Sequence, residues 1–371
     1  MRFLTKLEYK YRTFKEQIGA LIEFNFFEVA RQADRSFLLQ VWEAIWGWLR
    51  YGVLPVSYYN YGLYEDKAPL SKKIKAYVSD RSHFSKLGQV NQRHHLILSN
   101  KWVFHNYFDN YPIPLPKCWG YLHQYGGIWS ETGTSFDFDD LPEIFSRMNG
   151  HRIVLKPIYG SSGSRIAVAD VICDGDCHLK IAGAMVPLAE WARNLKKANY
   201  IIMECLTQHQ VLKAIYPHAI NTVRINTLND SRTVKIWGTN IKLGSGNAQV
   251  DNWAQGGIGV GIDMQSGKLL TGKYNIGWSH KIYPPFSAHP DTHVQFEGVT
   301  LPYWQELQEV VINAAKLVPM LPYIAWDVAI TPTGPCIIEG NSRSNLAMVQ
   351  VHGGLMSEET REWWRQFGIK I

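Results

Sequence analysis

The chain has 371 residues, which is enough for two to three domains or subdomains at roughly 150 residues each. Hydrophobic residues make up 46% and charged residues 19%, a balance that excludes intrinsic disorder as the main state. A net charge of +6 is modest for a nucleic-acid binder, so we expect no nucleic-acid partner, and it suits a protein that handles anionic small molecules.

The sequence also bears on the compartment. It shows no secretory signal pattern, and its most apolar stretch, residues 37–49, is too short to span a bilayer. Cys173 and Cys177 bracket an Asp-Gly-Asp turn without further ligands for a zinc site, so we expect free thiols in a reducing compartment. These features favour a cytoplasmic protein.

The sequence pattern of the first 95 residues differs from that of the rest and indicates a mainly helical extension. Asp34 or Ser36 is a suitable N-cap for a helix over residues 37–50. Apolar residues at helical spacing favour a buried core face of this helix, with a membrane-surface helix as the alternative. These residues are Leu38, Val41, Trp42, Ile45 and Leu49.

An aromatic cluster and a basic run follow this helix. The cluster consists of Tyr58, Tyr59, Tyr61 and Tyr64. Residues 67–86 carry six basic residues against one acid. Such a run indicates a solvated face or, as the alternative, contact with an anionic lipid or polysaccharide.

From about residue 96, short strands, glycine turns and isolated helices alternate, which indicates an α+β fold. The predicted strands cover residues 152–157, 166–171, 200–204, 221–228 and 233–243, followed by a hairpin of 324–330 and 336–339. The predicted helices cover residues 186–197 and 301–318.

A glycine–serine loop follows the strand at residues 152–157. In Gly160-Ser161-Ser162-Gly163, the backbone and hydroxyls can approach a phosphate, although a plain hairpin turn is the alternative. Lys156 ends an apolar run on that strand and needs an anionic partner if it is buried. A phosphate or an ordinary carboxylate would serve.

The terminal hairpin carries two acids. A five-residue turn at 331–335 places Asp327 directly opposite Glu339. Their Cβ atoms would lie about 5 Å apart, where like charges repel and a divalent cation converts the repulsion into coordination. Asn341, on the same face, adds a third oxygen. Mg²⁺ fits this set best, and a solvent-facing pair of acids is the alternative.

Two further segments are candidates for ligand contact. Arg224 alternates with Val223 and Ile225 on its strand, so it pairs with an acid or clamps a transferring phosphoryl group. Asp251-Asn252, followed by two glycines, is a polar turn suited to close ligand approach or simply a turn. The histidines form no set with acids in register, and no nucleophile elbow occurs, which disfavours serine and zinc hydrolases.

Together these segments resemble the ATP-grasp superfamily, and more narrowly its sugar-transfer-associated group. The superfamily motifs occur in order as Asn100-Lys101, Ile153-Val-Leu-Lys156-Pro, Ile202-Met-Glu204-Cys-Leu206, Asn221-Thr-Val-Arg224, Trp326-Asp327 and Ile338-Glu339-Gly-Asn341. Gln208-His209, Asp251-Asn252 and Gly256-Gly257 match the narrower group. The likeness covers about residues 96–371, and the Tyr58-Tyr59 region resembles the group's N-terminal extension.

The resemblance implies two α+β subdomains that clamp a nucleotide, at residues 96–206 and 207–371, behind an extension at 1–95. It implies ATP and Mg²⁺ as cofactors, with Mn²⁺ as an alternative metal. Lys101 and Lys156 would hold the phosphates from either side, under a lid formed by residues 160–163.

Other roles also follow from the resemblance. Glu204, with the backbone of Cys205 and Leu206, falls at the adenine hinge. Asp327, Glu339 and Asn341 match the metal ligands, and Arg224 matches the cation that steadies the transferred phosphoryl group. Arg343 is assigned to substrate binding, and the loop that begins at Asp251, which generic ATP-grasp ligases lack, to the acceptor site.

The function implied is that of an ATP-dependent carboxylate–amine ligase that forms an amide through an acyl phosphate. Its substrates would be a small-molecule, amino-acid or sugar-acid carboxylate and an amine, in polysaccharide biosynthesis. A kinase that phosphorylates a sugar or polyol hydroxyl, with Asp251 as base, is the alternative. A further alternative is a non-catalytic module that contacts a membrane or a glycosyltransferase through the extension. The oligomeric state stays open.

Overall fold

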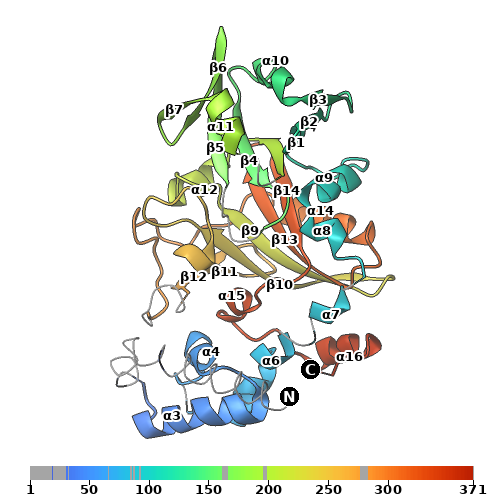
Figure 1. Ribbon diagram of the computed structural model, residues 1–371. Helices are drawn as coiled ribbons and strands as arrows, with labels where there is room; N and C mark the ends of the chain where they lie inside the picture. The colour runs from blue at the N-terminus through green and yellow to red at the C-terminus, as the bar shows by residue number, and fades with distance from the viewer. Residues whose placement is uncertain are drawn as a thin grey trace.

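The computed structural model describes residues 19, 31, 33–65, 67–83, 86, 88–91, 93–160, 166–194, 199–275 and 283–370. Within these ranges the chain forms one eight-stranded sheet, one six-stranded sheet and a helical N-terminal segment (Figure 1). In this view the eight-stranded sheet lies above the six-stranded sheet, and the N-terminal helices lie below both. The fold is therefore α+β, as the sequence predicts.

The eight-stranded sheet is antiparallel and has the order β3-β2-β1-β8-β4-β5-β6-β7. Helices α10 and α11 contact its later strands and close a core that includes Ile153, Leu155 and Val171. The strands are β1 (Cys118–His123), β2 (Gly126–Trp129), β3 (Ser135–Asp137), β4 (Arg152–Pro157), β5 (Ala167–Asp174), β6 (Asp176–Ile181), β7 (Ala184–Pro187) and β8 (Tyr200–Glu204). The helical elements are η4 (Phe138–Asp140), α10 (Leu141–Ser146) and α11 (Leu188–Asn194).

The predictions for this region are largely confirmed. β4 and β8 have the predicted bounds, and β4 pairs antiparallel with β5, as expected for strands joined by the glycine–serine loop. The predicted helix at 186–197 begins later, because residues 184–187 pair with β6 as strand β7. The last residues of that prediction lie outside the described residues.

The six-stranded sheet is also antiparallel, with the order β12-β11-β10-β9-β13-β14. Helix α14 (Trp304–Lys316) packs on the face that carries Val223 and Ile225, and α15 (Ala347–Gln350) contacts β10 and β11. The strands are β9 (Thr222–Asn229), β10 (Val234–Leu243), β11 (Ile258–Ile262), β12 (Leu269–Tyr274), β13 (Tyr323–Thr331) and β14 (Gly334–Asn341). The short helices α12 (Gln210–Ile215) and η5 (Trp253–Gln255) precede β9 and β11, and α16 (Glu358–Gln366) follows α15.

The turn between β13 and β14 is tighter than predicted. Thr331 pairs with Gly334, so only Pro332 and Thr333 lie between the paired positions, rather than five residues. A β-bulge then shifts the register by one residue between Asp327 and Val328. The bulge restores the predicted pairing of Asp327 with Glu339, although the predicted turn was wrong.

The N-terminal helices also correct one expectation. The predicted helix at 37–50 is formed by α3 (Phe37–Trp46) and the π-helical turn η1 (Gly47–Tyr51), but Leu38, Trp42 and Leu49 are exposed. The core interpretation of this stripe is therefore wrong for these three residues. The buried face of α3 carries Gln40, Glu43 and Ala44 instead. No helix in the described ranges is long and apolar enough to cross a membrane.

The rest of the extension packs against the segments around η5 and α15, beside the six-stranded sheet. The four predicted tyrosines are buried in one cluster with Trp253, Met348 and Val351. Its helical elements are α4 (Pro55–Asn60), α5 (Leu70–Lys73), η2 (Ile74–Ala76), α6 (Asp80–Ser82) and α7 (Gly88–Val90). Helices α8 (Leu96–Ser99) and α9 (Lys101–Phe108) follow the extension.

The expected free thiols at Cys173 and Cys177 are a second correction. The β5–β6 hairpin pairs these residues directly across the two strands, and the structure joins them in a disulfide. Gly175, at a positive φ of 77°, forms the turn between them. The sequence spacing alone did not reveal that the turn would place the two Cβ atoms face to face.

Candidate active site

A pocket of about 440 Å³ is lined by residues of both sheets and of the loops that join them. Nearly all of the predicted site residues line it: Lys101, Lys156, Gly160, Glu204, Cys205, Leu206, Arg224, Asp251, Asp327, Glu339, Asn341 and Arg343. Ser161, Ser162 and Gly163 lie outside the described residues. A pocket of this size suits a small-molecule ligand.

Strand register explains how the lower wall of the pocket forms. Arg224 on β9 pairs with Asp327 on β13, which in turn pairs with Glu339 on β14. Directly opposed residues in an antiparallel sheet point to the same side, so the three side chains share one face. Val223 and Ile225 point to the opposite face and are fully buried beneath α14, as the alternation predicts.

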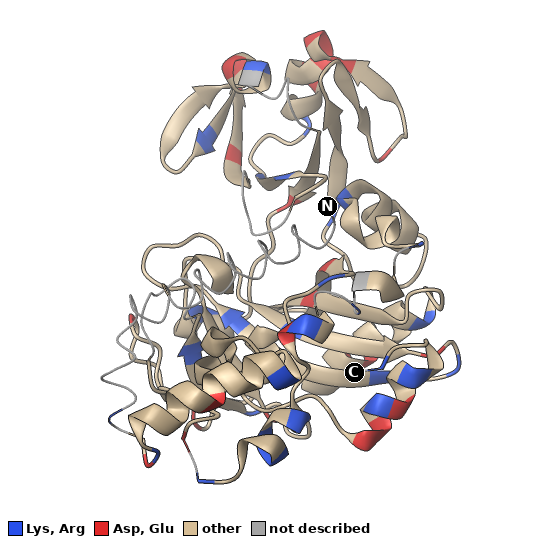
Figure 2. Ribbon diagram, turned by 60° about the horizontal axis from the view of Figure 1, so that its bottom comes forward, with Lys and Arg blue, Asp and Glu red and all other residues tan. Residues whose placement is uncertain are grey.

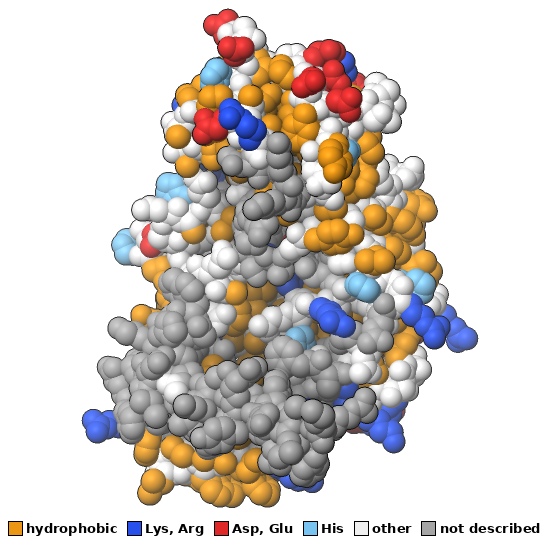
Figure 3. Space-filling view, viewed as in Figure 1, with side chains coloured by type: hydrophobic (Ala, Val, Ile, Leu, Met, Phe, Trp, Pro, Cys, Tyr) orange, Lys and Arg blue, Asp and Glu red, His pale blue; other side chains and the backbone are white. Residues whose placement is uncertain are grey.

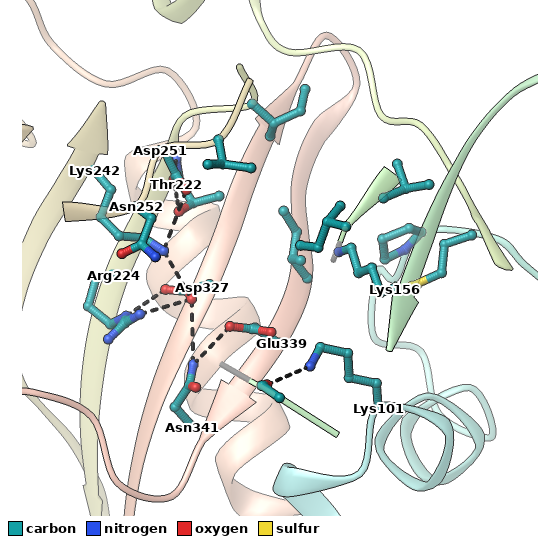
Figure 4. Close-up of a pocket in the computed structure, with 18 of the residues that line it drawn as sticks. Lys101, Lys156, Thr222, Arg224, Lys242, Asp251, Asn252, Asp327, Glu339 and Asn341 are labelled. Carbon is teal, nitrogen blue, oxygen red and sulfur yellow. Dashed lines mark hydrogen bonds and ion pairs between the residues drawn. The ribbon is translucent and has the colours of Figure 1, made fainter. Parts of the chain in front are cut away.

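Asp327 is the centre of this wall (Figure 4). Arg224 donates to both of its carboxylate oxygens, from Nε to Oδ1 at 2.5 Å and from Nη2 to Oδ2 at 2.9 Å. Lys242 Nζ lies 3.1 Å from Oδ2. Burial disfavours the charged carboxylate, but Arg224 and Lys242 outweigh it and lower the pKa of Asp327. The carboxylate is therefore ionised at neutral pH.

Lys242 also connects Asp327 to Asp251. Its Nζ lies 3.8 Å from Asp251 Oδ1, while Oδ2 of the same carboxylate accepts from the backbone and hydroxyl of Thr222. Burial raises the pKa of Asp251, and Lys242 and Thr222 oppose that shift. Asp251 is thus held by two hydrogen bonds from Thr222 and an ion pair with Lys242, and its pKa is higher than that of an ordinary Asp.

Two further lysines of the pocket, Lys101 and Lys156, come from α9 and β4. Lys101 is the first residue of α9, whose N-cap Asn100 accepts from the next two backbone amides, and its Nζ donates to Gly160 O at 3.1 Å. Lys156 projects from β4. Burial lowers the pKa of Lys156; Glu339 opposes this shift and Lys101 adds to it. Figure 4 shows the lysines on the opposite side of Asp327 and Glu339 from Arg224.

The predicted hinge lies where β8 ends. Glu204 N donates to Lys117 O and Cys205 N donates to Arg152 O, so the fold itself uses both amides. Adenine recognition at this position would therefore depend on the carbonyls, the Glu204 side chain and the groups of Leu206. Burial raises the pKa of the Cys205 thiol, which disfavours a reactive thiolate here.

The predicted metal ligands lie together. Asn341 Nδ2 is 3.3 Å from Glu339 Oε1 and 3.5 Å from Asp327 Oδ2. Rotation of this amide about its last bond would present the oxygen to a cation instead. Two carboxylates and an amide fit Mg²⁺, which takes few protein oxygens and keeps water and phosphate ligands. Among the described residues, no three His, Cys, Asp or Glu side chains form a metal cluster, so this set depends on Asn341.

Sequence reasoning missed two residues that contact the acidic side chains or Arg224 in the pocket, Lys242 and Ser344. Lys242 pairs with Thr222 across β9 and β10 and stands between the fully buried Ile241 and Leu243. A lysine within an apolar strand was the signal that singled out Lys156, and the same signal would have found Lys242. Ser344, which accepts from Arg224 Nη1, stands in a loop and gave no such signal.

The comparison with known families follows this geometry. The sequence matches the sugar-transfer associated ATP-grasp family over residues 82–361. This match covers most of the chain, which therefore belongs to that family. The match begins before residue 96, where the resemblance was expected to start. A search of curated proteins gave no match.

Several solved structures are similar in fold at low identity. An ADP complex of N5-carboxyaminoimidazole ribonucleotide synthetase is 12% identical and covers 67% of this chain and 46% of its own, with a TM-score of 0.36. The Aspergillus clavatus N5-carboxyaminoimidazole synthase is 10% identical and covers 72% of this chain and 52% of its own, with a TM-score of 0.38. The ATP-grasp ligase PsnB is 12% identical and covers 68% of this chain and 52% of its own, with a TM-score of 0.32. The chain spans about half the length of these structures.

Proposed function

We propose that the chain binds ATP in this pocket and joins a carboxylate to an amine, releasing ADP and phosphate. The arrangement around Asp327 and Glu339 carries the proposal. Arg224 and Lys242 contact Asp327 from one side, and Lys101 and Lys156 lie on the opposite side of the two carboxylates. Cations on two sides of a paired-carboxylate centre suit a bound triphosphate with its metal. Family membership supports the nucleotide.

The reaction proceeds in two balanced steps. A carboxylate oxygen of the acid substrate attacks the γ-phosphorus, the bond to the β–γ bridging oxygen breaks, and ADP leaves. The amine then attacks the acyl carbon, the bond to the phosphate oxygen breaks, inorganic phosphate leaves, and the amine loses a proton to solvent. No protein nucleophile is needed, in keeping with a Cys205 thiol whose pKa is raised.

The residues of the pocket have separate tasks in this scheme. Arg224, already oriented by Asp327 and Ser344, stabilises charge on the transferred phosphoryl group. Lys101 and Lys156 hold the phosphates, and a phosphate beside Lys156 would favour its charged form against the effect of burial. Mg²⁺, or Mn²⁺, held by Asp327, Glu339 and Asn341 would neutralise the polyphosphate. Arg343 and the loop at Asp251, which line the same pocket, would contact the acid and the amine.

The substrate class and the compartment belong to the same proposal. The family's association with sugar transfer supports an amino acid or sugar acid from polysaccharide biosynthesis as the carboxylate. We place the enzyme in the cytoplasm on the ground that ATP is available there; the Cys173–Cys177 disulfide removes the argument from free thiols.

The test is ADP formation by the purified chain with Mg·ATP and an extract of small metabolites. Substrate-dependent ADP release that is lost in Asp327→Asn supports the proposal. ADP release that persists in this variant contradicts it, because the reaction would then use another site. A folded wild-type chain that neither binds nor turns over ATP also contradicts it.

A kinase on the same scaffold is the second candidate, and the raised pKa of Asp251 favours it. A base near the acceptor would remove the proton of a sugar or polyol hydroxyl. Asp251→Asn keeps an acceptor for Thr222 but cannot take that proton. The kinase predicts that this variant is inactive, whereas the ligase predicts a weakened but measurable activity.

A further inference from the structure

Helix α3 and turn η1 expose a strip of large apolar side chains. Leu38, Trp42 and Leu49 are 78%, 58% and 62% exposed, and Trp46 stacks on Trp42 with ring centroids 5.7 Å apart. Positions 38, 42, 46 and 49 follow helical spacing and form one face. We call these four residues the α3 surface. Figure 3 shows hydrophobic side chains gathered along the lower edge of the molecule, where α3 lies in Figure 1.

Polar contacts on the opposite face hold this surface outward. Glu43 forms a buried ion pair with Arg35 and accepts from Tyr58 OH at 2.8 Å. Gln40 Nε2 donates to Arg35 O at 2.9 Å. Rotating α3 to bury Leu38 would expose these groups and break the ion pair. The exposure of the α3 surface is thus built into the packing of the helix.

The segments next to the α3 surface carry an excess of basic side chains. Arg81 donates to Trp48 O at 3.1 Å and to Leu49 O at 3.4 Å, and segment α5–η2 packs under the buried side of η1, where a Cβ at Gly47 would lie 3.3 Å from Ile74 Cδ1. Among the described residues from 31 to 86, the exposed basic ones are Arg31, Arg50, Lys67, Lys72, Lys75 and Arg81, and the exposed acidic ones are Asp34 and Glu65. Figure 2 shows Lys and Arg on short helices beside α3.

We propose that the α3 surface docks on the headgroup region of a bilayer that contains anionic lipid. Exposed leucines beside two stacked tryptophans, next to segments with an excess of basic side chains, match the chemistry of an interfacial helix. The basic excess favours an anionic bilayer over a neutral apolar protein face. This inference does not rest on the proposed ligase activity, because none of these side chains lines the pocket.

The test is flotation of the full chain with phosphatidylcholine vesicles, with and without phosphatidylserine. We expect binding to the anionic vesicles that weakens as salt rises. Trp42→Ser with Leu49→Ser should weaken binding on the order of tenfold or more, because buried apolar area is lost. Neutralising Lys72 or Lys75 to Gln should weaken it by about fivefold each.

Matched controls separate this surface from general stickiness. Tyr125 is 71% exposed and lies between β1 and β2, and Met185 is exposed on β7. Both belong to the part of the chain that forms the eight-stranded sheet, away from α3. Tyr125→Ser and Met185→Ser should bind vesicles as the wild type does. Circular dichroism should show that all variants remain folded.

Three results would overturn the proposal. The first is a folded wild-type chain that does not float with anionic vesicles. The second is vesicle binding that the α3 variants leave unchanged. The third is self-association in analytical ultracentrifugation that depends on Trp42 and Leu49 without vesicle binding, which would assign the α3 surface to a second copy of the chain. These readouts do not involve ATP, so failure here leaves the proposed function standing.

Discussion

At the scale of single residues, Asp327 is the centre of a network of charged side chains. It pairs directly with Arg224, contacts Lys242 and lies opposite Glu339, while Lys242 extends the network to Asp251. A buried carboxylate with two cations is held by its partners, and removing one of them leaves an uncompensated charge. The network thus orients Arg224 before any ligand enters.

The first prediction concerns Glu339. Its carboxylate lies beside Asn341 and is not engaged by Arg224, so it has the greatest freedom to bind a cation. Glu339→Gln should reduce metal-dependent ADP formation by about 100-fold or more. Glu143→Gln, at an exposed pair with Arg147, is the control and should keep full activity. Equal activities for the two variants would remove Glu339 from the metal site.

The second prediction concerns the stability effect of Asp251. Because its folded pKa is raised by burial, ionisation of Asp251 destabilises the folded state, and stability falls as pH rises through that pKa. Asp251→Asn removes this penalty and keeps an acceptor for Thr222. At neutral pH the variant should unfold at a higher temperature than the wild type, and the difference should vanish below the unfolded pKa of about 3.9.

Thermal unfolding followed across pH checks this expectation. A variant that is less stable than the wild type at neutral pH would contradict it. Such a result would mean that the ion pair with Lys242 outweighs the burial of Asp251.

Residue positions were predictable where strand alternation or pairing defined them. Alternation with Val223 and Ile225 placed Arg224 correctly, and the pairing of Asp327 with Glu339 was correct despite the wrong turn. The partners of Asp327 were not predictable in the same way. They depend on which strands are neighbours in the sheet, and β9 pairs with β13, nearly a hundred residues later in the chain.

At the scale of elements, α3 shows a limit of periodicity. Apolar spacing identifies the residues that share a face, but it does not decide which face points inward. Here the buried contacts of Glu43 with Arg35 and Tyr58 decide it. The β5–β6 hairpin is a similar case, because its disulfide follows from a turn geometry that the spacing left open.

The third prediction concerns contacts of segment η2. A Cβ at Gly354 would lie 2.0 Å from the backbone oxygen of Ala76, whereas a Cβ at Gly47 would meet only the side chains of Leu70 and Ile74. Gly354→Ala should destabilise the fold by about 2–3 kcal/mol, because a backbone contact cannot relax easily. Gly47→Ala, within a helical segment, should change stability by no more than about 1 kcal/mol.

Chemical denaturation of the two glycine variants measures this difference. Equal effects would indicate that the C-terminal segment and η2 do not pack as the structure shows.

At the scale of the whole molecule, the pocket is lined from both sheets, and the N-terminal extension packs beneath the loop that carries Asp251. Trp253 and Met348 belong both to the pocket lining and to the buried cluster that holds the tyrosines. The extension therefore supports the proposed acceptor side. The domain boundaries at 95 and 206 stay a prediction.

The fourth prediction follows from ligand binding across the pocket. A ligand that contacts both sheets stabilises the folded state by about 2.7 kcal/mol at a concentration 100-fold above its Kd. Mg·ATP should therefore raise the unfolding temperature of the wild type. Lys101→Met and Lys156→Met should lose most of this shift, and Lys213→Met, on the exposed face of α12, should retain it. A shift that all variants share would place the nucleotide elsewhere.

Accurate-mass analysis of the reaction products tests the proposed ligation most directly. The purified chain would be incubated with Mg·ATP and a metabolite extract. We predict a new product whose mass equals two metabolites minus one water, formed together with ADP and free phosphate. A metabolite heavier by one phosphoryl group, with ADP and no matching free phosphate, would contradict ligation and identify the enzyme as a kinase.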